Sequence, residues 1–141
     1  MKTLDDAIRL AVKAHEGQKD KNHQPYILHP LRVMLAVSTD YEKMVAVLHD
    51  VVEDTQITMT HLIDAGYPKE VVDAVYIMTK SSPLRYDDYI EGVKQNPIAR
   101  TVKIADIRDN ASPMRLYMLD PDTIDRLTKK YSKALKFLLE E

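Results

Sequence analysis

Apolar residues recur along this chain at intervals of three and four residues, with little of the strict alternation that marks a half-buried strand. This spacing lines apolar side chains along one side of an α-helix. Glycine is scarce, with three residues in 141, and 45% of the residues are hydrophobic. The sequence therefore predicts an all-α fold of about seven or eight helices. No internal repeat, charge block or low-complexity linker divides it, so we expect one domain over residues 1–141.

Caps and breakers set the expected helix boundaries. Thr3 followed by Asp6 is typical of a capping box. Thr58 is a candidate N-cap, and Asn96 before a proline is another. The Ser-Ser-Pro sequence at 81–83 is predicted to end the fifth helix. The expected helices cover residues 4–16, 26–38, 41–53, 58–66, 68–80, 87–95, 97–109 and 122–139.

The sequence contains no cysteine, which removes whole classes of site. The chain can have neither disulfides nor a thiolate nucleophile nor a cysteine-ligated zinc site, so any metal ion must be held by histidine and carboxylate side chains. The 20 Lys and Arg against 22 Asp and Glu give a net charge of −2. This balance argues against a nucleic-acid module with a strong basic patch, but it is compatible with a small phosphorylated ligand.

No stretch of the sequence has the length and apolarity of a membrane span. Uninterrupted apolar runs, such as residues 33–37, are far shorter than the roughly 20 residues that a span needs. Near the N-terminus, Asp5, Asp6 and Arg9 interrupt the apolar run that a signal peptide requires. We therefore expect a soluble, cytoplasmic protein.

The most informative segment is Leu-His-Asp-Val-Val-Glu-Asp-Thr at residues 48–55. At 100° per residue, His49, Asp50 and Glu53 lie on the side of the helix opposite its apolar stripe, and Asp54 lies at the edge of that side. Clustered carboxylates repel one another by roughly 0.2–0.5 kcal/mol per pair when exposed, and more when buried. A bound divalent cation would turn this repulsion into attraction. The simpler interpretation is a solvated acidic face.

A metal ion needs ligands from more than one helix, and the sequence offers two further candidates. His29, near the expected start of a helix, is either a ligand or a hydrogen-bonded core residue. Asp106 lies beside an apolar stripe with Lys103 on the same flank, and it is either a ligand or half of a surface ion pair. The Ile-Ala that precedes Asp106 favours the first of these alternatives.

Four motifs, in this order, are similar to those of one enzyme family. They are Ala-His-Glu-Gly-Gln at 14–18, Pro-Tyr-Ile-Leu-His-Pro at 25–30, the octapeptide at 48–55, and Val-Lys-Ile-Ala-Asp at 102–106 followed by Asn110. The pattern of His29, His49-Asp50 and Asp106 resembles the H…HD…D signature of the HD-superfamily phosphohydrolases. The whole set resembles the (p)ppGpp hydrolase domain of RelA/SpoT-type enzymes and the small alarmone hydrolases, and the similarity extends over nearly the whole chain.

The resemblance implies an all-α fold that binds one divalent ion, usually Mn²⁺, and acts on a small-molecule nucleotide. The implied metal ligands are His29, His49, Asp50 and Asp106. Mixed imidazole and carboxylate sites with open positions suit such an ion, whose coordinated water becomes a nucleophile near neutral pH. Family members remove the 3′-pyrophosphate of (p)ppGpp, giving GDP or GTP and pyrophosphate. The family's acidic pair maps onto Glu53 and Asp54, which are implied to orient and deprotonate the attacking water.

Other residues are implied to contact the nucleotide or to support the site. The candidates for substrate binding are Lys21, Lys103, Asn110 and Tyr131. For Asn110 the alternative is a helix C-cap, and for Tyr131 it is a core position in the apolar stripe of the last helix. The two lysines are candidates because they could neutralise a pyrophosphate. His15 is expected to support the site without touching the metal.

Two departures from the family pattern affect nucleotide recognition. Asp20 stands where the family usually has an arginine, and Arg115 is displaced by three residues from the family's Asn-Met-Arg. Neither change touches the implied metal ligands. The sequence therefore favours phosphohydrolase chemistry more strongly than it favours guanosine tetraphosphate as the substrate.

Two other functions stay open at this point. One is a nucleotidase or phosphomonoesterase of the same superfamily, which would release phosphate instead of pyrophosphate. The other is a nucleotide-binding sensor without catalysis, although every residue implied in metal binding and water activation is present. The amphipathic last helix fits either a monomer or a homodimer.

Overall fold

The chain has an all-α fold, as predicted. The computed structural model describes residues 1–80 and 83–141, so the predicted break at Ser81 and Ser82 lies outside the described residues. The helices assigned within these two ranges are α1 (Leu4–Ala14), α2 (Leu28–Leu35), α3 (Asp40–Asp54), α4 (Met59–Ala65), α5 (Lys69–Met78), α6 (Tyr86–Gln95), α7 (Pro97–Asn110), α8 (Pro113–Leu116) and α9 (Pro121–Leu139). Eight of these nine helices correspond to predicted ones, and the sequence did not predict the short α8.

Local sequence signals explain where several helices begin and end. Thr3 forms a capping box at the start of α1, as predicted. Helix α4 begins after Thr58, whose side chain accepts a hydrogen bond from a backbone amide, and Gly66 forms its C-cap. Gly66 has a φ of 90°, a left-handed conformation that glycine adopts without strain. The Asn96 side chain caps α7 in the same way as Thr58 caps α4.

Helix α2 is shorter than the predicted helix over 26–38. It ends at Leu35, and the next helix explains the difference. The backbone amides of Ser38 and Thr39 both donate to the Glu42 carboxylate, each at 3.0 Å. Because these residues form the N-terminal cap of α3, they cannot also continue α2.

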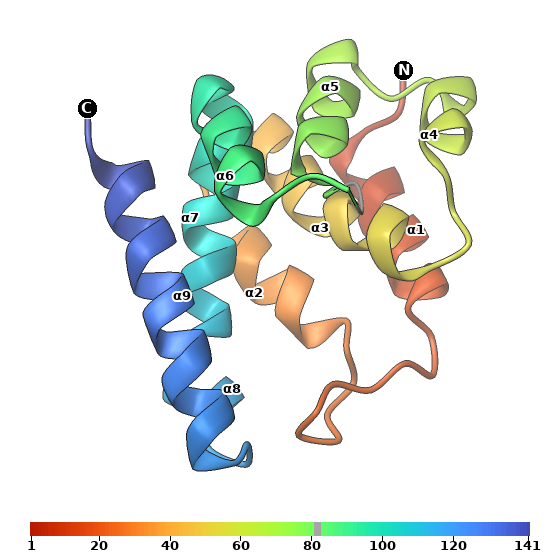
Figure 1. Ribbon diagram of the computed structural model, residues 1–141. Coiled ribbons are helices and arrows are strands. Elements are labelled where there is room, and N and C mark those ends of the chain that lie inside the picture. The colour runs from red at the N-terminus through yellow and green to blue at the C-terminus, as the bar shows by residue number, and fades with distance from the viewer. Residues whose placement is uncertain (81–82) are drawn as a thin grey trace.

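Helix α3 runs through the middle of the molecule and packs against α1, α2, α5 and α7 (Figure 1). Every residue from Met44 to Val51 is buried, including His49 and Asp50. The sequence placed these two polar residues opposite the apolar stripe, and the structure covers that side of the helix as well. Polar groups buried in this way need partners, because water cannot satisfy them.

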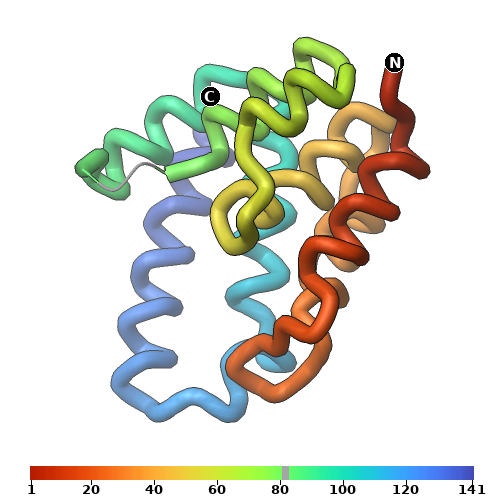
Figure 2. The backbone as a smooth tube through the Cα atoms, turned by 90° about the vertical axis from the view of Figure 1, so that its right-hand side faces the viewer, coloured from red at the N-terminus to blue at the C-terminus, as the bar shows by residue number. Residues whose placement is uncertain are grey.

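Helix α9 lies alongside α7 on the outside of the fold, and the loop between α1 and α2 lies near the end of α7 (Figure 2). Asn22 in this loop donates from Nδ2 to the backbone carbonyls of Met114 at 3.1 Å and Arg115 at 3.0 Å. These bonds join the loop to α8. In the described parts of the chain, no helix combines the length and apolarity needed to cross a membrane.

Candidate metal centre

The four predicted metal ligands meet between helices α2, α3 and α7. His29 lies on α2, His49 and Asp50 on α3, and Asp106 on α7. His29 Nε2 lies 2.9 Å from Asp106 Oδ1 and 3.5 Å from Asp50 Oδ2. His49 Nε2 lies 3.1 Å from Asp50 Oδ1 and 3.5 Å from Asp106 Oδ1. Each residue is at most 6% exposed, so the structure brings all four into one buried cluster.

The backbone of α3 determines which nitrogen of His49 faces the cluster. His49 Nδ1 lies 3.1 Å from the carbonyl oxygen of Ala46, and by donating there it leaves the Nε2 lone pair free. Although Asp50 lies close, Nε2 makes no hydrogen bond of good geometry to any residue that the structure describes. A buried nitrogen without a partner is costly unless something binds it. This orphaned lone pair is what a metal ligand at this position would offer.

A further carboxylate, that of Asp109, contacts His29 on the side of the ring that faces away from the cluster. His29 Nδ1 lies 2.6 Å from Asp109 Oδ2, which leaves Nε2 facing the cluster. Burial raises the pKa of the Asp109 carboxyl, but hydrogen bonds from His29 and Arg32 outweigh it and lower that pKa to about 2. Asp109 and Arg32 were not among the residues predicted from the sequence. A signal was present, because each lies three residues after a predicted ligand and so shares its helix face.

Lys103 compensates part of the negative charge of the aspartates in the cluster. Its Nζ lies 2.9 Å from Asp106 Oδ2 and 5.4 Å from the centre of the Tyr89 ring. The pair that the sequence suggested therefore exists, but it is largely buried and not a surface pair. Burial lowers the pKa of Lys103, yet Asp106 and Tyr89 outweigh this effect and hold that pKa well above its usual value. Lys103 thus contacts a predicted metal ligand.

The donor set of the cluster fits a divalent cation. Two imidazoles and two carboxylates suit an ion such as Mn²⁺ or Zn²⁺. His29, Asp50 and Asp106 each offer a ligand atom within 4.8 Å of the others. Burial lowers the pKa of His49, but Asp50 and Asp106 outweigh it and raise that pKa well above its usual value. The cluster therefore attracts positive charge, whether as a proton or as a metal ion.

We expect protons and metal ions to compete for this cluster. The pKa of His29 is also raised, because hydrogen bonds to Asp106 and Asp109 outweigh its burial. In the metal-free protein, protonation of these two histidines stabilises the folded state, because their pKa values are higher there than in the unfolded chain. This stabilisation is complete at pH values below the ordinary pKa of 6.5, and it is lost as the pH rises through the raised pKa values. Mn²⁺ binds neutral imidazole, so it should restore stability at higher pH. The rise in melting temperature on adding Mn²⁺ should therefore be larger at pH 8 than at pH 6, and an equal rise would contradict this competition.

The last turn of α3 carries the predicted water-activating pair at the edge of the cluster. Glu53 Oε1 accepts the backbone N–H of Lys80 at 3.1 Å, and Asp54 Oδ2 accepts the Tyr26 hydroxyl at 3.2 Å. The same hydroxyl also donates to Asp50 Oδ2 at 3.0 Å, a contact that was not predicted from the sequence. Partial desolvation raises the pKa of both Glu53 and Asp54 above the usual values. Such a shift moves a carboxylate toward the pKa of an efficient general base near neutral pH.

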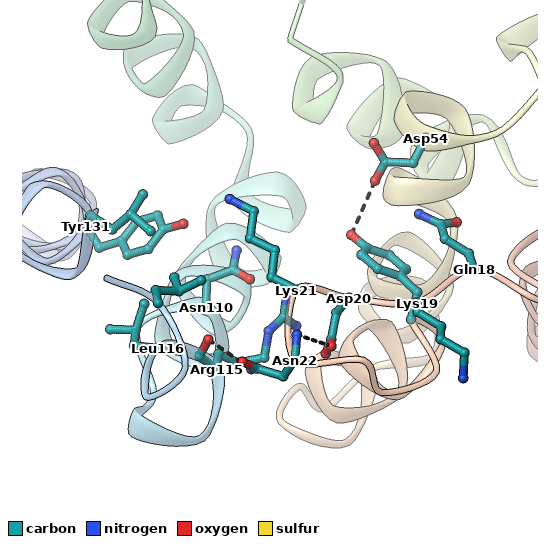
Figure 3. Close-up of a pocket in the computed structure, with 13 residues that line it drawn as sticks. Gln18, Lys19, Asp20, Lys21, Asn22, Asp54, Asn110, Arg115, Leu116 and Tyr131 are labelled. Atoms are coloured by element: carbon teal, nitrogen blue, oxygen red, sulfur yellow. Dashed lines mark hydrogen bonds between the residues drawn. The ribbon is translucent and has the colours of Figure 1, made fainter. Parts of the chain in front are cut away.

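A cavity of about 310 Å³ adjoins this acidic pair (Figure 3). It is lined by residues 18–22 of the first loop together with residues from α3, α7, α8 and α9. Lys21, Asn110 and Tyr131, three of the four predicted substrate contacts, line it. Asp54 lines it as well and so joins the cavity to the predicted catalytic pair. The fourth predicted contact, Lys103, does not belong to its lining.

Both departures from the family pattern lie in this cavity. Asp20 Oδ1 accepts the backbone N–H groups of Asn22 at 2.8 Å and Gln24 at 3.0 Å, so this carboxylate shapes the loop. Arg115 lines the cavity in spite of its displacement in the sequence (Figure 3). The arginine that lines the cavity therefore lies on α8, whereas the family pattern has an arginine in the loop.

His15 contacts the loop and Tyr26. Its Nδ1 lies 2.8 Å from Gln18 Oε1, and its ring centre lies 5.0 Å from that of Tyr26. Because Tyr26 in turn contacts Asp50 and Asp54, His15 lies one contact away from the predicted site. This position is consistent with the supporting role that the resemblance implies.

Two histidines and two aspartates thus meet between the helices of an all-α fold, as the H…HD…D signature implies. The chain is 36% identical over 100 residues to the bifunctional (p)ppGpp synthase/hydrolase SpoT of Escherichia coli K12. The matched region covers 68% of this chain and 14% of that protein. It is 33% identical over 133 residues to the guanosine-3′,5′-bis(diphosphate) 3′-pyrophosphohydrolase of Haemophilus influenzae. Here the matched region covers 86% of this chain and 20% of that protein. The chain thus spans only a small part of the length of these relatives.

A solved structure has the same fold. It is a metazoan ortholog of SpoT, described as hydrolysing ppGpp and playing a role in starvation responses, and it matches with a TM-score of 0.76 at 23% identity. The match covers 94% of this chain and 85% of that one. No protein-family model matches the chain. The predicted resemblance is confirmed: the chain is similar to the HD domain of SpoT-like (p)ppGpp hydrolases.

Proposed function

We propose that this chain hydrolyses the 3′-pyrophosphate of guanosine tetra- or pentaphosphate, or of a related phosphorylated nucleotide, giving GDP or GTP and pyrophosphate. The observation that carries the proposal is a buried His/His/Asp/Asp cluster joined through Asp50, Tyr26 and Asp54 to a cavity of about 310 Å³. A volume of this order is typical of small-molecule sites. The similarity to (p)ppGpp hydrolases supports this choice of substrate.

The proposed metal ion is Mn²⁺, held by the four residues of the buried cluster. When bound, such an ion supplies a Lewis acid for phosphoryl oxygens and lowers the pKa of coordinated water. One of these residues, Asp106, accepts a hydrogen bond from Lys103 at 2.9 Å, which limits its orientation. Lys103 therefore acts through Asp106 in this proposal, and its direct contact with a substrate phosphate stays a prediction.

Glu53 and Asp54 orient the attacking water and accept its proton. Asp54 lines the cavity, and Glu53 is held by the Lys80 amide at 3.1 Å. Water attacks the phosphorus bonded to the 3′ oxygen, the bond between these two atoms breaks, and the 3′ oxygen leaves with a proton. General-base assistance of this kind contributes roughly 10²–10⁴-fold to a rate.

The nucleotide occupies the cavity with its phosphates toward the cationic side chains. Lys21 and Arg115 supply positive charge, and Asn110 offers an amide to the ribose or a phosphate. Tyr131 offers an aromatic face to the base. We also propose a cytoplasmic location, and we leave monomer and homodimer as alternatives that a molar-mass measurement in solution would separate.

The direct test is a substrate panel with product analysis. Mn²⁺-loaded protein is incubated with ppGpp, pppGpp, their adenine analogues and NADPH, and the products are separated by anion-exchange chromatography. We expect pyrophosphate together with GDP or GTP. Release of inorganic phosphate alone would identify a phosphomonoesterase instead. No product from any of these compounds would contradict the proposal and favour a non-catalytic nucleotide sensor.

A further inference from the structure

Asp109 lies outside the predicted site, yet it contacts one of the four proposed metal ligands directly. Its Oδ2 lies 2.6 Å from His29 Nδ1, on the side of the ring that faces away from the cluster. The other ring nitrogen, Nε2, lies 2.9 Å from Asp106 Oδ1. An imidazole that donates from one nitrogen to a carboxylate keeps the lone pair of the other nitrogen for a metal ion. Asp109 therefore selects the nitrogen that His29 presents.

Asp109 is itself held in one orientation. Arg32 Nε lies 2.8 Å from Oδ1, and a terminal nitrogen of Arg32 lies 3.1 Å from Oδ2, so the planar guanidinium contacts both carboxylate oxygens. Arg115 approaches the same carboxylate from the cavity at 3.4 Å. The Asp109 side chain is only 12% exposed, which leaves water little room to replace these contacts. Two arginines thus keep the carboxylate aimed at His29.

We propose that Asp109 is a positioning residue for the metal centre, which holds His29 with Nε2 directed at Asp50 and Asp106 while Arg32 holds Asp109. This inference rests on the proposed function, because it assumes a divalent ion in the cluster. Metal-binding histidines almost always donate their second nitrogen to such a partner, and loss of the partner typically weakens metal binding by roughly 10–100-fold. A residue that acts in this way changes metal affinity even when no nucleotide is present.

The test measures Mn²⁺ affinity, with the free ion detected by electron paramagnetic resonance and no nucleotide added. In Asp109→Asn the side chain keeps its size and one oxygen but loses the charge that holds the His29 N–H. We expect Mn²⁺ binding to weaken by roughly 10–100-fold. Asp73→Asn is the matched control, because Asp73 pairs with Lys69 in a solvent-exposed i,i+4 pair on α5. We expect the control to bind Mn²⁺ as the wild type does.

Thermal unfolding in EDTA separates positioning from a merely structural role. A structural role would lower the metal-free melting temperature of Asp109→Asn and leave its Mn²⁺ affinity unchanged, and this result would overturn the inference. If Asp109→Asn does not fold, Arg32→Gln decides the question. That variant removes the two shorter contacts of the Asp109 carboxylate and leaves the Arg115 contact at 3.4 Å, so the carboxylate is held less firmly. Its Mn²⁺ affinity should also fall, and an unchanged affinity would overturn the inference.

The same titration distinguishes failure of this inference from failure of the proposed function. If the wild-type protein binds no Mn²⁺, both the proposed function and this inference are contradicted. If the wild-type protein binds Mn²⁺, but no more tightly than Asp109→Asn does, only this inference is contradicted.

Discussion

Replacing Asp106 with Asn is expected to abolish turnover and also to lower the free energy of unfolding of the metal-free protein by about 3–5 kcal/mol. The first effect follows from the loss of a proposed metal ligand. The second follows from Lys103, whose largely buried Nζ lies 2.9 Å from Asp106 Oδ2. An asparagine cannot balance the Lys103 charge, and a buried charge without its partner is strongly destabilising. Pyrophosphate release measures the first effect, and urea unfolding in EDTA measures the second.

His49→Gln is the variant that separates these two effects. His49 also contributes to the cluster, but among the described residues no lysine pairs with it, and its Nδ1 contacts carbonyls of its own helix. We expect turnover to fall as far as in Asp106→Asn, with a smaller loss of stability at pH 8 in EDTA. Equal losses of stability in the two variants would contradict the importance of the Lys103–Asp106 pair.

The helices were largely predictable because their ends depend on local interactions. Thr3, Thr58 and Asn96 each accept a backbone amide three residues ahead, so a short window of sequence contains the whole interaction. Helix α8 could not be predicted in this way. It begins at Pro113 and has only four residues, too few for an apolar stripe to develop.

The grouping of the four cluster residues was predictable from motifs, whereas the contacts that hold them were not. Asp109 contacts His29 and Arg32 across 80 and 77 residues of sequence. These contacts depend on how α2 lies against α7, and a sequence pattern does not specify the register between two packed helices. The burial of α3 on both sides was also undecided, because a cluster of acids is equally typical of a solvated face.

The cavity contains both positions at which the sequence departs from the family pattern. Asp20 and Arg115 are both departures from the family pattern that affect nucleotide recognition. In the structure, the Asp20 carboxylate accepts hydrogen bonds from two backbone amides of its own loop. Arg115 on α8 lines the same cavity as Lys21. A motif comparison by position cannot detect this, because the guanidinium comes from a different segment of the chain.

Replacing Glu53 with Gln and Asp54 with Asn together is expected to lower turnover by a factor of about 10²–10⁴ while Mn²⁺ affinity stays close to that of the wild type. Both amides keep an oxygen that can accept the Lys80 N–H and the Tyr26 O–H, so the geometry of the last turn of α3 is preserved. What the substitutions remove is the capacity to accept a proton from water. Single-turnover pyrophosphate release at saturating Mn²⁺ measures this loss without a contribution from product dissociation.

The charge change needs its own control, because removing two carboxylates also makes the site less repulsive to a polyanionic substrate. That electrostatic effect alone would favour binding, so it should leave KM unchanged or lower it. Glu70→Gln with Asp73→Asn makes the same change in net charge on α5 and should leave turnover unaffected. A large fall in kcat without a rise in KM in the first variant therefore isolates loss of the base. If Mn²⁺ affinity falls in parallel with turnover, the acidic pair acts through the metal ligands, and its role as the base is wrong.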